Sequence, residues 1–518
     1  VPELSGGWLI IADNAAFGSR LVEGFETSGA TALLANVAAD AIDKGFDTVA
    51  ALAGQLAGNL SGIVIAIGLE AAANIPGRLR YDMLGAVARL PELTGVKPVR
   101  IMVVTRGGVP VLDEPVSDDE ASLVFGPVGM LEVESENLMP QHIDFGADGD
   151  AMSDRNIRRL LAEAAQEKFE RLVAWRKRRW LRRFEPVALP PSQEAPAILK
   201  DRGVYLITGG TGGIGRTLAR WLAEHVSARI VMTSRNPLPP RSEWDQLVAN
   251  PGEGDRISRI IADLLHIEAA GGEISVECAD VADRDAMRGV VERTRQKWGA
   301  IDGVIHAAGN PGAGKLFVMD DPEEVSRTLS PKVGGMSVLA EILGDMPLDF
   351  FAVMSSINGI FAAPGNAAYS SANAYLDAFA NAAARPANWK RYVVFNWDAW
   401  RDVGMAARIE VAENRRAERE RFLSKAILPD VGAEIFARLL GSDIDQVVVT
   451  PYNLPLIVAA QRTRTWKRAS AGDAAGSFGN EFTSGASIPV SEMIAARFER
   501  EEERVIAAIW EELIGAEM

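Results

Sequence analysis

Five glycines within residues 209–215 constrain the fold of this chain more than any other feature of its sequence. The apolar residues 204–207 before them predict a buried parallel strand, and residues 216–223 after them repeat apolar side chains at helical spacing. A glycine turn between a strand and a helix lets backbone N–H groups reach the pyrophosphate of a dinucleotide at the helix N-terminus. The sequence therefore predicts a dinucleotide-binding turn formed by Gly209, Thr211, Gly212, Gly213 and Ile214.

The composition limits the possible partners. The chain has 518 residues, is 48% hydrophobic and carries a formal net charge of −16. Its length predicts more than one domain, and its acidity argues against a nucleic-acid partner. One basic stretch, residues 176–183, is interpreted as an amphipathic helix whose aromatic neighbours pack on a domain while its cations stay in water. No run approaches the roughly 20 apolar residues of a membrane span, so we expect no membrane partner either.

The cysteine and the histidines also restrict the chemistry. Cys278 is the only cysteine, which excludes an intrachain disulfide and favours a reducing cytoplasm. It lies in an apolar strand pattern, so we expect a packed thiol rather than a nucleophile. The four histidines show no metal-ligand spacing, so no metal site is expected. The chain starts with neither an initiator Met nor a signal peptide, so we expect a segment of a longer polypeptide.

Strand and helix patterns alternate through two segments, which predicts two α/β units with Rossmann-like, doubly wound parallel sheets. In the first unit, residues 1–186, the first turn at residues 13–18 holds larger side chains than the glycine turn. We expect them to keep a pyrophosphate away, so this unit is interpreted as structural. A Pro-containing linker, residues 187–203, leads to the second unit, residues 204–464. The strand candidates of the first unit lie at the opening of residues 7–18 and at residues 62–68 and 99–105.

Three further segments lie within or after the second unit. Residues 236–255 are rich in Pro and charge and predict a surface insertion, followed by a helix over residues 259–270. Residues 465–490 are rich in Gly, Ala and Ser and predict a flexible linker. Residues 491–518 carry the pattern of an acidic amphipathic helix.

Strand ends after the glycine turn carry side chains suited to a nicotinamide dinucleotide. After the strand at residues 229–233 come Ser234 and Arg235, where NAD sites tend to hold a carboxylate and an arginine favours the 2′-phosphate of NADP. An arginine at a strand end can equally be plain surface, but beside the glycine turn it predicts NADPH. Later strand ends place two residues at the adenine edge and three small residues beside the cofactor: Asp280, Val281, Ala307, Ala308 and Gly309.

Four residues further along the chain form a proton-transfer set: Ser356, Tyr369, Asn373 and Lys332. Tyr369 lies at the start of a helix predicted for residues 370–384, and because Asn373 follows it by four residues the two share one helix face. A phenol can protonate a developing alkoxide once its pKa falls from about 10, and a nearby ammonium lowers that pKa. Ser356 can hydrogen-bond the substrate carbonyl. Each residue also has a purely structural interpretation, but their joint occurrence after a dinucleotide turn favours catalysis.

These motifs resemble the ketoreductase domain of modular polyketide synthases, a branch of the short-chain dehydrogenase/reductase family. The resemblance rests on the glycine turn, residues 306–309, residues 355–356 and residues 369–377, and it spans about residues 5–465. Most short-chain reductases carry lysine four residues after the tyrosine. Here that position is Asn373, and residues 330–335 match the upstream segment from which this branch supplies its lysine.

The resemblance implies a substrate and partners. It implies NADPH-dependent reduction of a β-ketoacyl thioester carried by the phosphopantetheine arm of an acyl carrier protein, inside a synthase with further domains. In this interpretation residues 491–518 begin such a carrier, or form a simple terminal helix. The markers of product configuration disagree. Residues 312–314 replace the Leu-Asp-Asp motif typical of one class, and Phe361 replaces a tryptophan typical of the opposite class, whereas Pro364 favours the first class. Phe361, Pro364 and Met405 are expected at the substrate pocket, and residues 403–426 are expected to form a mobile lid.

Two other interpretations remain open. One is a free-standing short-chain alcohol dehydrogenase for small substrates, against which the non-binding first unit and the carrier-like tail argue. The other is a redox-silent domain that serves only as a scaffold within a synthase. The complete set of Tyr369, Ser356, Lys332 and the glycine turn argues against that role.

Overall fold

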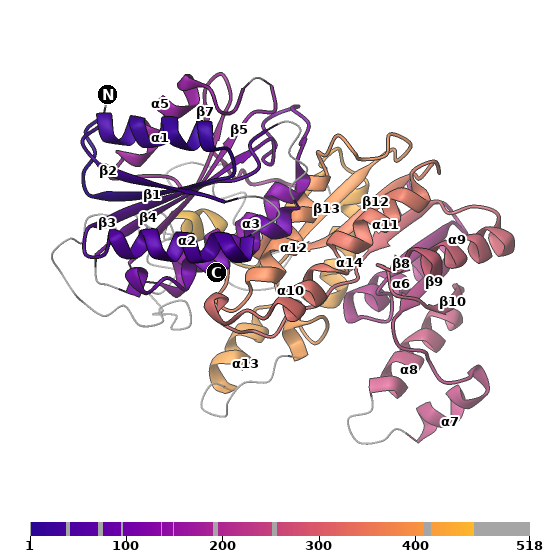
Figure 1. Cartoon of the computed structure of the whole chain (residues 1–518). Helices are drawn as coiled ribbons and strands as arrows, with labels where there is room; N and C mark the ends of the chain where they lie inside the picture. Colours follow the sequence, from indigo (N-terminus) through magenta and orange to yellow (C-terminus); the bar gives the residue numbers. More distant parts are fainter. Residues whose placement is uncertain are drawn as a thin grey trace, which may run out of the picture.

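The computed structural model describes residues 2–37, 42–70, 76–94, 97–135, 137–148, 150–189, 195–250, 256–408 and 416–459. Two seven-stranded sheets dominate it, with strand orders β2-β1-β3-β4-β5-β6-β7 and β10-β9-β8-β11-β12-β13-β14. Every pairing in them is parallel except that of β6 with β7. The predicted fold of two doubly wound units is therefore confirmed. Figure 1 shows the two units side by side.

Both sheets are covered by helices, and their first strands, β1 and β8, are buried along their whole length, as central parallel strands require. The strands are β1 (Gly7–Ala12), β2 (Thr31–Asn36), β3 (Leu60–Ala66), β4 (Val99–Arg106), β5 (Leu138–Phe145), β6 (Leu172–Trp175), β7 (Arg179–Trp180), β8 (Val204–Thr208), β9 (Arg229–Ser234), β10 (Glu273–Cys278), β11 (Gly303–His306), β12 (Phe350–Ser356), β13 (Tyr392–Trp397) and β14 (Gln446–Val449). The α-helices are α1 (Ala15–Thr27), α2 (Ile42–Gln55), α3 (Gly77–Ala88), α4 (Phe125–Glu134), α5 (Asp154–Ala164), α6 (Gly213–Val226), α7 (Trp244–Ala249), α8 (Arg256–Ala269), α9 (Arg284–Trp298), α10 (Pro322–Leu329), α11 (Val333–Leu343), α12 (Ala367–Phe379), α13 (Arg416–Ser424) and α14 (Pro429–Leu440).

The two units share one of their buried hydrophobic clusters. A single buried cluster joins Val124 and Val128 from the first unit to Ala367 and Tyr375 of α12 in the second. Helix α4 can approach α12 closely because Gly126 has no side chain: a Cβ there would collide with the main-chain oxygen of Ala367. A hydrogen bond of 2.6 Å from Ser371 Oγ to the main-chain oxygen of Leu123 ties the same region together. The first unit therefore buttresses the helix that carries Tyr369 and Asn373.

The basic stretch at residues 176–183 is not a helix, and that prediction was wrong. It contains the turn and second strand of a short antiparallel hairpin formed by β6 and β7. Its arginines pair with buried carboxylates: Arg176 with Asp144 at 3.0 Å, and Arg179 with Glu163 at 2.7 Å. Interior carboxylates need such cations to offset their desolvation, so Arg176 and Arg179 face inward. The other cations of the stretch are exposed: Lys177, Arg178, Arg182 and Arg183.

The predicted packing of Cys278 was also wrong. Cys278 is exposed at the end of β10, where its Sγ lies 3.5 Å from the main-chain oxygen of Arg235. Apolar residues alternate with polar ones before Cys278, a pattern that predicted a buried strand, but β10 is the outermost strand of its sheet. An edge strand leaves side chains at its end uncovered.

The remaining secondary-structure predictions agree well with the structure. The helix expected over residues 259–270 is α8, and the surface insertion before it carries α7, which projects from the body of the molecule (Figure 1). Of the predicted lid, residues 409–415 lie outside the described residues, as do residues 465–490 and 491–518. Within the described part of the chain, no helix has the length and apolar character needed to cross a membrane.

Candidate functional site

The glycine turn joins β8 to α6. Gly209 adopts a φ of +64°, and a Cβ on it would lie 2.7 Å from the Cα of Ala308. Gly212 caps α6 without any side-chain hydrogen bond to the helix N-terminus. The first N–H groups of α6 are thus available to an anion, and Gly209 must be glycine because both its conformation and its neighbour exclude a side chain.

The strand ends predicted to hold the adenosine end lie next to each other in the same sheet. Ser234 ends β9 and pairs with Cys278 at the end of β10. Arg235 follows Ser234 and is exposed. Asp280 Oδ1 accepts a 3.0 Å hydrogen bond from the Ala282 N–H, which shapes the turn after β10, and Val281 is buried against α11. The end of β9 therefore offers a guanidinium that is accessible to a phosphate.

Gly309 lies where the loop after β11 meets the predicted lysine. A Cβ on Gly309 would lie 3.0 Å from the Met405 methyl group and 3.1 Å from the Cε of Lys332. Lys332 is 2% exposed, and its Nζ donates a 2.7 Å hydrogen bond to the main-chain oxygen of Met354. Ala307 and Ala308 precede Gly309 beside the glycine turn. Gly309 thus has no side chain where the Met405 methyl group and Lys332 come close to it.

The structure brings Ser356, Tyr369 and Asn373 together. Ser356 is the last residue of β12, and Tyr369 and Asn373 lie one turn apart in α12. Burial raises the pKa of Tyr369, whereas side-chain hydrogen bonds with Ser356 and Asn373 lower it. Asn373 Nδ2 donates to the main-chain oxygen of Tyr369 at 2.7 Å. The Asn373 Oδ1 is buried and has no hydrogen-bond partner within the described residues.

Lys332 carries the most consequential pKa shift at this site. Burial lowers the pKa of its ammonium to about 7, while the carboxylate of Asp377 acts in the opposite direction. Near neutral pH a lysine with this pKa exists in both protonation states, as suits a group that takes part in proton transfer.

Asp377 is a site neighbour that the sequence-based set of residues omitted. Its Oδ1 accepts from Ser355 Oγ at 2.6 Å and its Oδ2 from Asn396 Nδ2 at 2.7 Å. Burial raises the pKa of Asp377 to about 6, and Lys332 lowers it. The carboxylate thus links α12 to the ends of β12 and β13 behind Ser356. Its spacing of eight residues from Tyr369 was visible in the sequence, but its partners were not.

The three predicted substrate-pocket residues occupy different surroundings. The ring of Phe361 packs against Phe184, with centroids 5.5 Å apart. Pro364 is exposed, and Met405 lies against Gly309 and Lys332. Just before Met405, the loop after β13 lies against the glycine turn: a Cβ on Gly213 would be 2.5 Å from the Gly404 nitrogen. This contact was not predicted, because the motifs involved lie far apart in the sequence.

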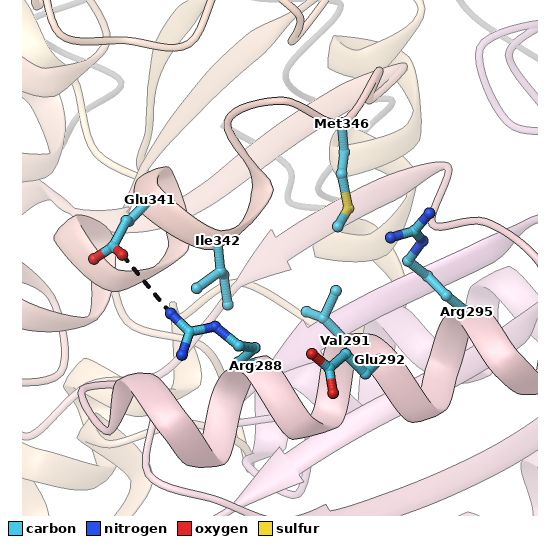
Figure 2. Close-up of a pocket in the computed structure, with 7 residues that line it drawn as sticks. All are labelled: Arg288, Val291, Glu292, Arg295, Glu341, Ile342 and Met346. Atoms are coloured by element: carbon cyan, nitrogen blue, oxygen red, sulfur yellow. Dashed lines mark ion pairs between the residues drawn. The ribbon is translucent and has the colours of Figure 1, made fainter.

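A separate cavity of about 270 Å³ lies between α9 and the α11 region (Figure 2). Its lining includes Arg288 and Glu341, whose charged groups are 3.9 Å apart, and none of the predicted catalytic or cofactor-binding residues. Among the described residues, no cluster of His, Cys, Asp or Glu is arranged to hold a metal ion.

Comparison with known proteins places this geometry in a family. Residues 203–402 match the family model described as the KR domain. A phenolphthiocerol/phthiocerol polyketide synthase of Mycobacterium tuberculosis is 31% identical over 73% of this chain and 19% of its own length. The 6-methylsalicylic acid synthase of Aspergillus terreus is 32% identical over 50% of this chain and 14% of its own length. The chain therefore spans less than a fifth of the length of these relatives.

Solved structures give the same result. The ketoreductase from the first module of phoslactomycin biosynthesis in Streptomyces sp. HK803 is 26% identical, has a TM-score of 0.64, and is matched over 90% of this chain and 93% of its own. The first ketoreductase of the tylosin polyketide synthase, at 24% identity and a TM-score of 0.68 over 89% of this chain and 93% of its own, shares the fold. Such domains reduce a β-keto group with a nicotinamide cofactor. The chain belongs with the ketoreductase domains of polyketide synthases, in the short-chain dehydrogenase/reductase superfamily.

Proposed function

We propose that this protein uses NADPH to reduce a β-ketoacyl thioester, carried by an acyl carrier protein, to the β-hydroxyacyl thioester. The observation that carries the proposal is the convergence of Ser356, Tyr369 and Asn373. The buried Lys332 hydrogen-bonds the main chain of the same strand end, at Met354. The homologous polyketide synthases, which are much longer than this chain, support a role beside other domains and a carrier-bound substrate.

The residues at the glycine turn fit a dinucleotide. The uncapped N-terminus of α6 suits the pyrophosphate, and the exposed Arg235 suits the 2′-phosphate of NADPH. The buried Oδ1 of Asn373, which has no hydrogen-bond partner in the part of the chain that the structure describes, offers an acceptor to a hydroxyl or amide group. When bound, the cofactor supplies the hydride that adds to the carbonyl carbon.

The protein's own residues then manage the proton and the carbonyl oxygen. Ser356 donates a hydrogen bond to the carbonyl oxygen and fixes its angle toward Tyr369. Tyr369 delivers its phenolic proton to that oxygen as negative charge develops there. Hydrogen bonds with Ser356 and Asn373 offset part of the rise in the pKa of Tyr369 that burial causes. In its protonated form, Lys332 adds a positive charge at the same end of β12, where its Nζ donates to the main-chain oxygen of Met354. Asn373 holds the first turn of α12 through the main-chain oxygen of Tyr369.

The test is NADPH oxidation with a short β-ketoacyl thioester mimic, followed by chiral analysis of the alcohol. We expect Tyr369→Phe to lower kcat by about 1,000-fold, in the range typical of general acid catalysis, with an unchanged Kd for NADPH measured by fluorescence titration. Folded wild-type protein that binds NADPH without turnover would instead indicate a redox-silent scaffold. An equal loss of cofactor binding and turnover in Tyr369→Phe would contradict the proton-donor role.

A further inference from the structure

Two loops of the second unit border the proposed site and touch each other. One, residues 307–320, follows β11 and passes Lys332; the other, residues 357–366, connects Ser356 to the helix of Tyr369. They meet at Gly314 and Gly365, where a Cβ on Gly365 would lie 2.7 Å from the main-chain oxygen of Gly314. Gly365 has a φ of +76°, so both the contact and the conformation require glycine. The relative position of the two loops therefore depends on this junction.

A carboxylate from the first unit holds both loops at that junction. Glu134 is the last residue of α4. Its Oε1 accepts a 2.9 Å hydrogen bond from the Gly365 N–H, and its Oε2 accepts a 2.7 Å hydrogen bond from the Phe317 N–H. Each loop thus gives one backbone donor to a different oxygen of the same side chain. A charged acceptor makes both bonds stronger than neutral ones.

The first unit contacts the same loops at further points. Arg171, paired with Glu132 at 2.8 Å, donates a 3.1 Å hydrogen bond to the main-chain oxygen of Ile360. The ring of Phe317 packs edge-on against Tyr81 of α3, with centroids 5.5 Å apart. Glu134 differs from these contacts because it alone among them bonds to both loops.

A substrate that contacts both Ser356 and Tyr369 must lie against the loop that joins them. The position of that loop therefore limits how the acyl chain can lie and which face of the ketone can meet the hydride. We propose that Glu134, although it belongs to the non-catalytic unit, is a positioning residue that holds the loops at residues 307–320 and 357–366 and thereby sets substrate orientation. This inference rests on the proposed ketoreductase function.

The variant Glu134→Gln separates this role from general stability. A glutamine can accept only one of the two hydrogen bonds and places an amide N–H₂ against the other N–H. We expect KM for the thioester mimic to rise and the ratio of the two alcohol configurations to fall, each by about tenfold, the factor that one charge-assisted hydrogen bond is worth. The Kd for NADPH should stay unchanged, because Glu134 contacts none of the predicted cofactor-binding residues in the described structure.

The matched control is Glu163→Gln. Glu163 is another buried carboxylate of the first unit, and its partners Gln141, Trp175 and Arg179 all lie in that unit. It should lower the melting temperature without altering KM or the product ratio. Gly365→Ala disturbs the same junction from the second unit and should reproduce the effect of Glu134→Gln on KM and the product ratio. If Glu134→Gln does not fold, Gly365→Ala takes its place as the test of the inference.

Unchanged KM and product ratio in a folded Glu134→Gln protein, or equal changes in Glu163→Gln, would overturn the inference. If Glu134→Gln does not fold, an unaltered product ratio in Gly365→Ala would also overturn the inference. If wild-type protein fails to oxidise NADPH with the thioester mimic, the proposed function itself is refuted. Those two failures are distinguishable, because the first requires an active wild-type enzyme.

Discussion

The two α/β units share a sheet topology but differ at the turn after their first strand. In the second unit, the N-terminus of α6 is preceded by glycine and has no side-chain cap. In the first unit, Asn14 Oδ1 accepts a 2.8 Å hydrogen bond from the Phe17 N–H, and Phe17 is buried. One helix therefore has a side-chain acceptor for one of its N-terminal N–H donors, whereas the other has none. Under the proposed function, the same architecture serves as a scaffold in one unit and as a binding site in the other, and a few residues in one turn set the difference.

The units also differ in how they treat buried charge. In the first, Arg176 and Arg179 are paired with carboxylates that are fully buried. In the second, the buried Lys332 donates to a main-chain oxygen, and burial lowers its pKa to about 7. A buried ion pair stabilises the fold only while both of its charges are present. An ammonium whose pKa lies near neutral pH can instead gain or lose a proton during a reaction. This contrast matches the proposed division of roles.

The largest expected effect concerns the contact that joins the units. In Gly126→Ala the new Cβ would collide with the main chain of α12, so we expect a loss of about 3 kcal/mol in the free energy of unfolding, together with reduced activity. Denaturant unfolding should remain a single transition, because the two units share a core. Two separate unfolding transitions in the wild-type protein would show that the two units do not unfold cooperatively.

The control for that substitution is Gly289→Ala in α9. There a Cβ would meet only the flexible end of the Arg293 side chain. Alanine is the better helix former, so this variant should gain up to about 1 kcal/mol in stability. A comparable loss in both variants would show that the α4–α12 contact has no special role.

Next in size is the acid sensitivity that each unit owes to a buried histidine. His142 is hydrogen-bonded to Thr105, and His306 to Thr208, each at 2.7 Å; burial lowers both pKa values from 6.5 to about 3. Between pH 6.5 and about pH 3, each histidine is protonated in the unfolded chain but neutral in the folded protein. The free energy of unfolding therefore decreases as the pH is lowered through this range. Each histidine should contribute about 1.4 kcal/mol per pH unit to this slope.

Denaturant unfolding of His142→Phe and His306→Phe between about pH 4 and 6 measures that slope. If the units unfold together, the pH dependence of the free energy of unfolding should be smaller than in wild type by the same amount in both variants. A change in one variant only would mean that the units unfold separately.

The smallest effects test the two turns directly. In Gly213→Ala the methyl group would crowd the Gly404 nitrogen beside the proposed pyrophosphate site, so we expect the Kd for NADPH to rise by about tenfold. In Asn14→Gly the first unit should lose only a few tenths of a kcal/mol, with cofactor affinity unchanged. Fluorescence titration and denaturant unfolding of both variants check this. A weaker Kd in Asn14→Gly would mean that the first turn influences the cofactor site.

Short-range patterns made much of this protein predictable. The strand, glycine turn and helix at residues 204–223 follow from local periodicity and backbone freedom, and so does the placement of Tyr369 and Asn373 on one helix face. The hairpin at β6–β7 was mispredicted because its arginines follow the buried carboxylates of distant elements rather than a local period. The exposure of Cys278 depended on which strand forms the sheet edge, which is also a long-range property.

The sequence by itself determined the double α/β architecture and the identity of the residues proposed to bind NADPH and transfer a proton, because each lies in a short motif whose geometry the local backbone sets. Only the tertiary structure decided how they are held. Glu134 and Gly365 are 231 residues apart, and neither has a motif that names the other. Packing of α4 on α12 brings them into hydrogen-bond distance, because burial of a shared apolar core, not local propensity, sets how two folded units meet.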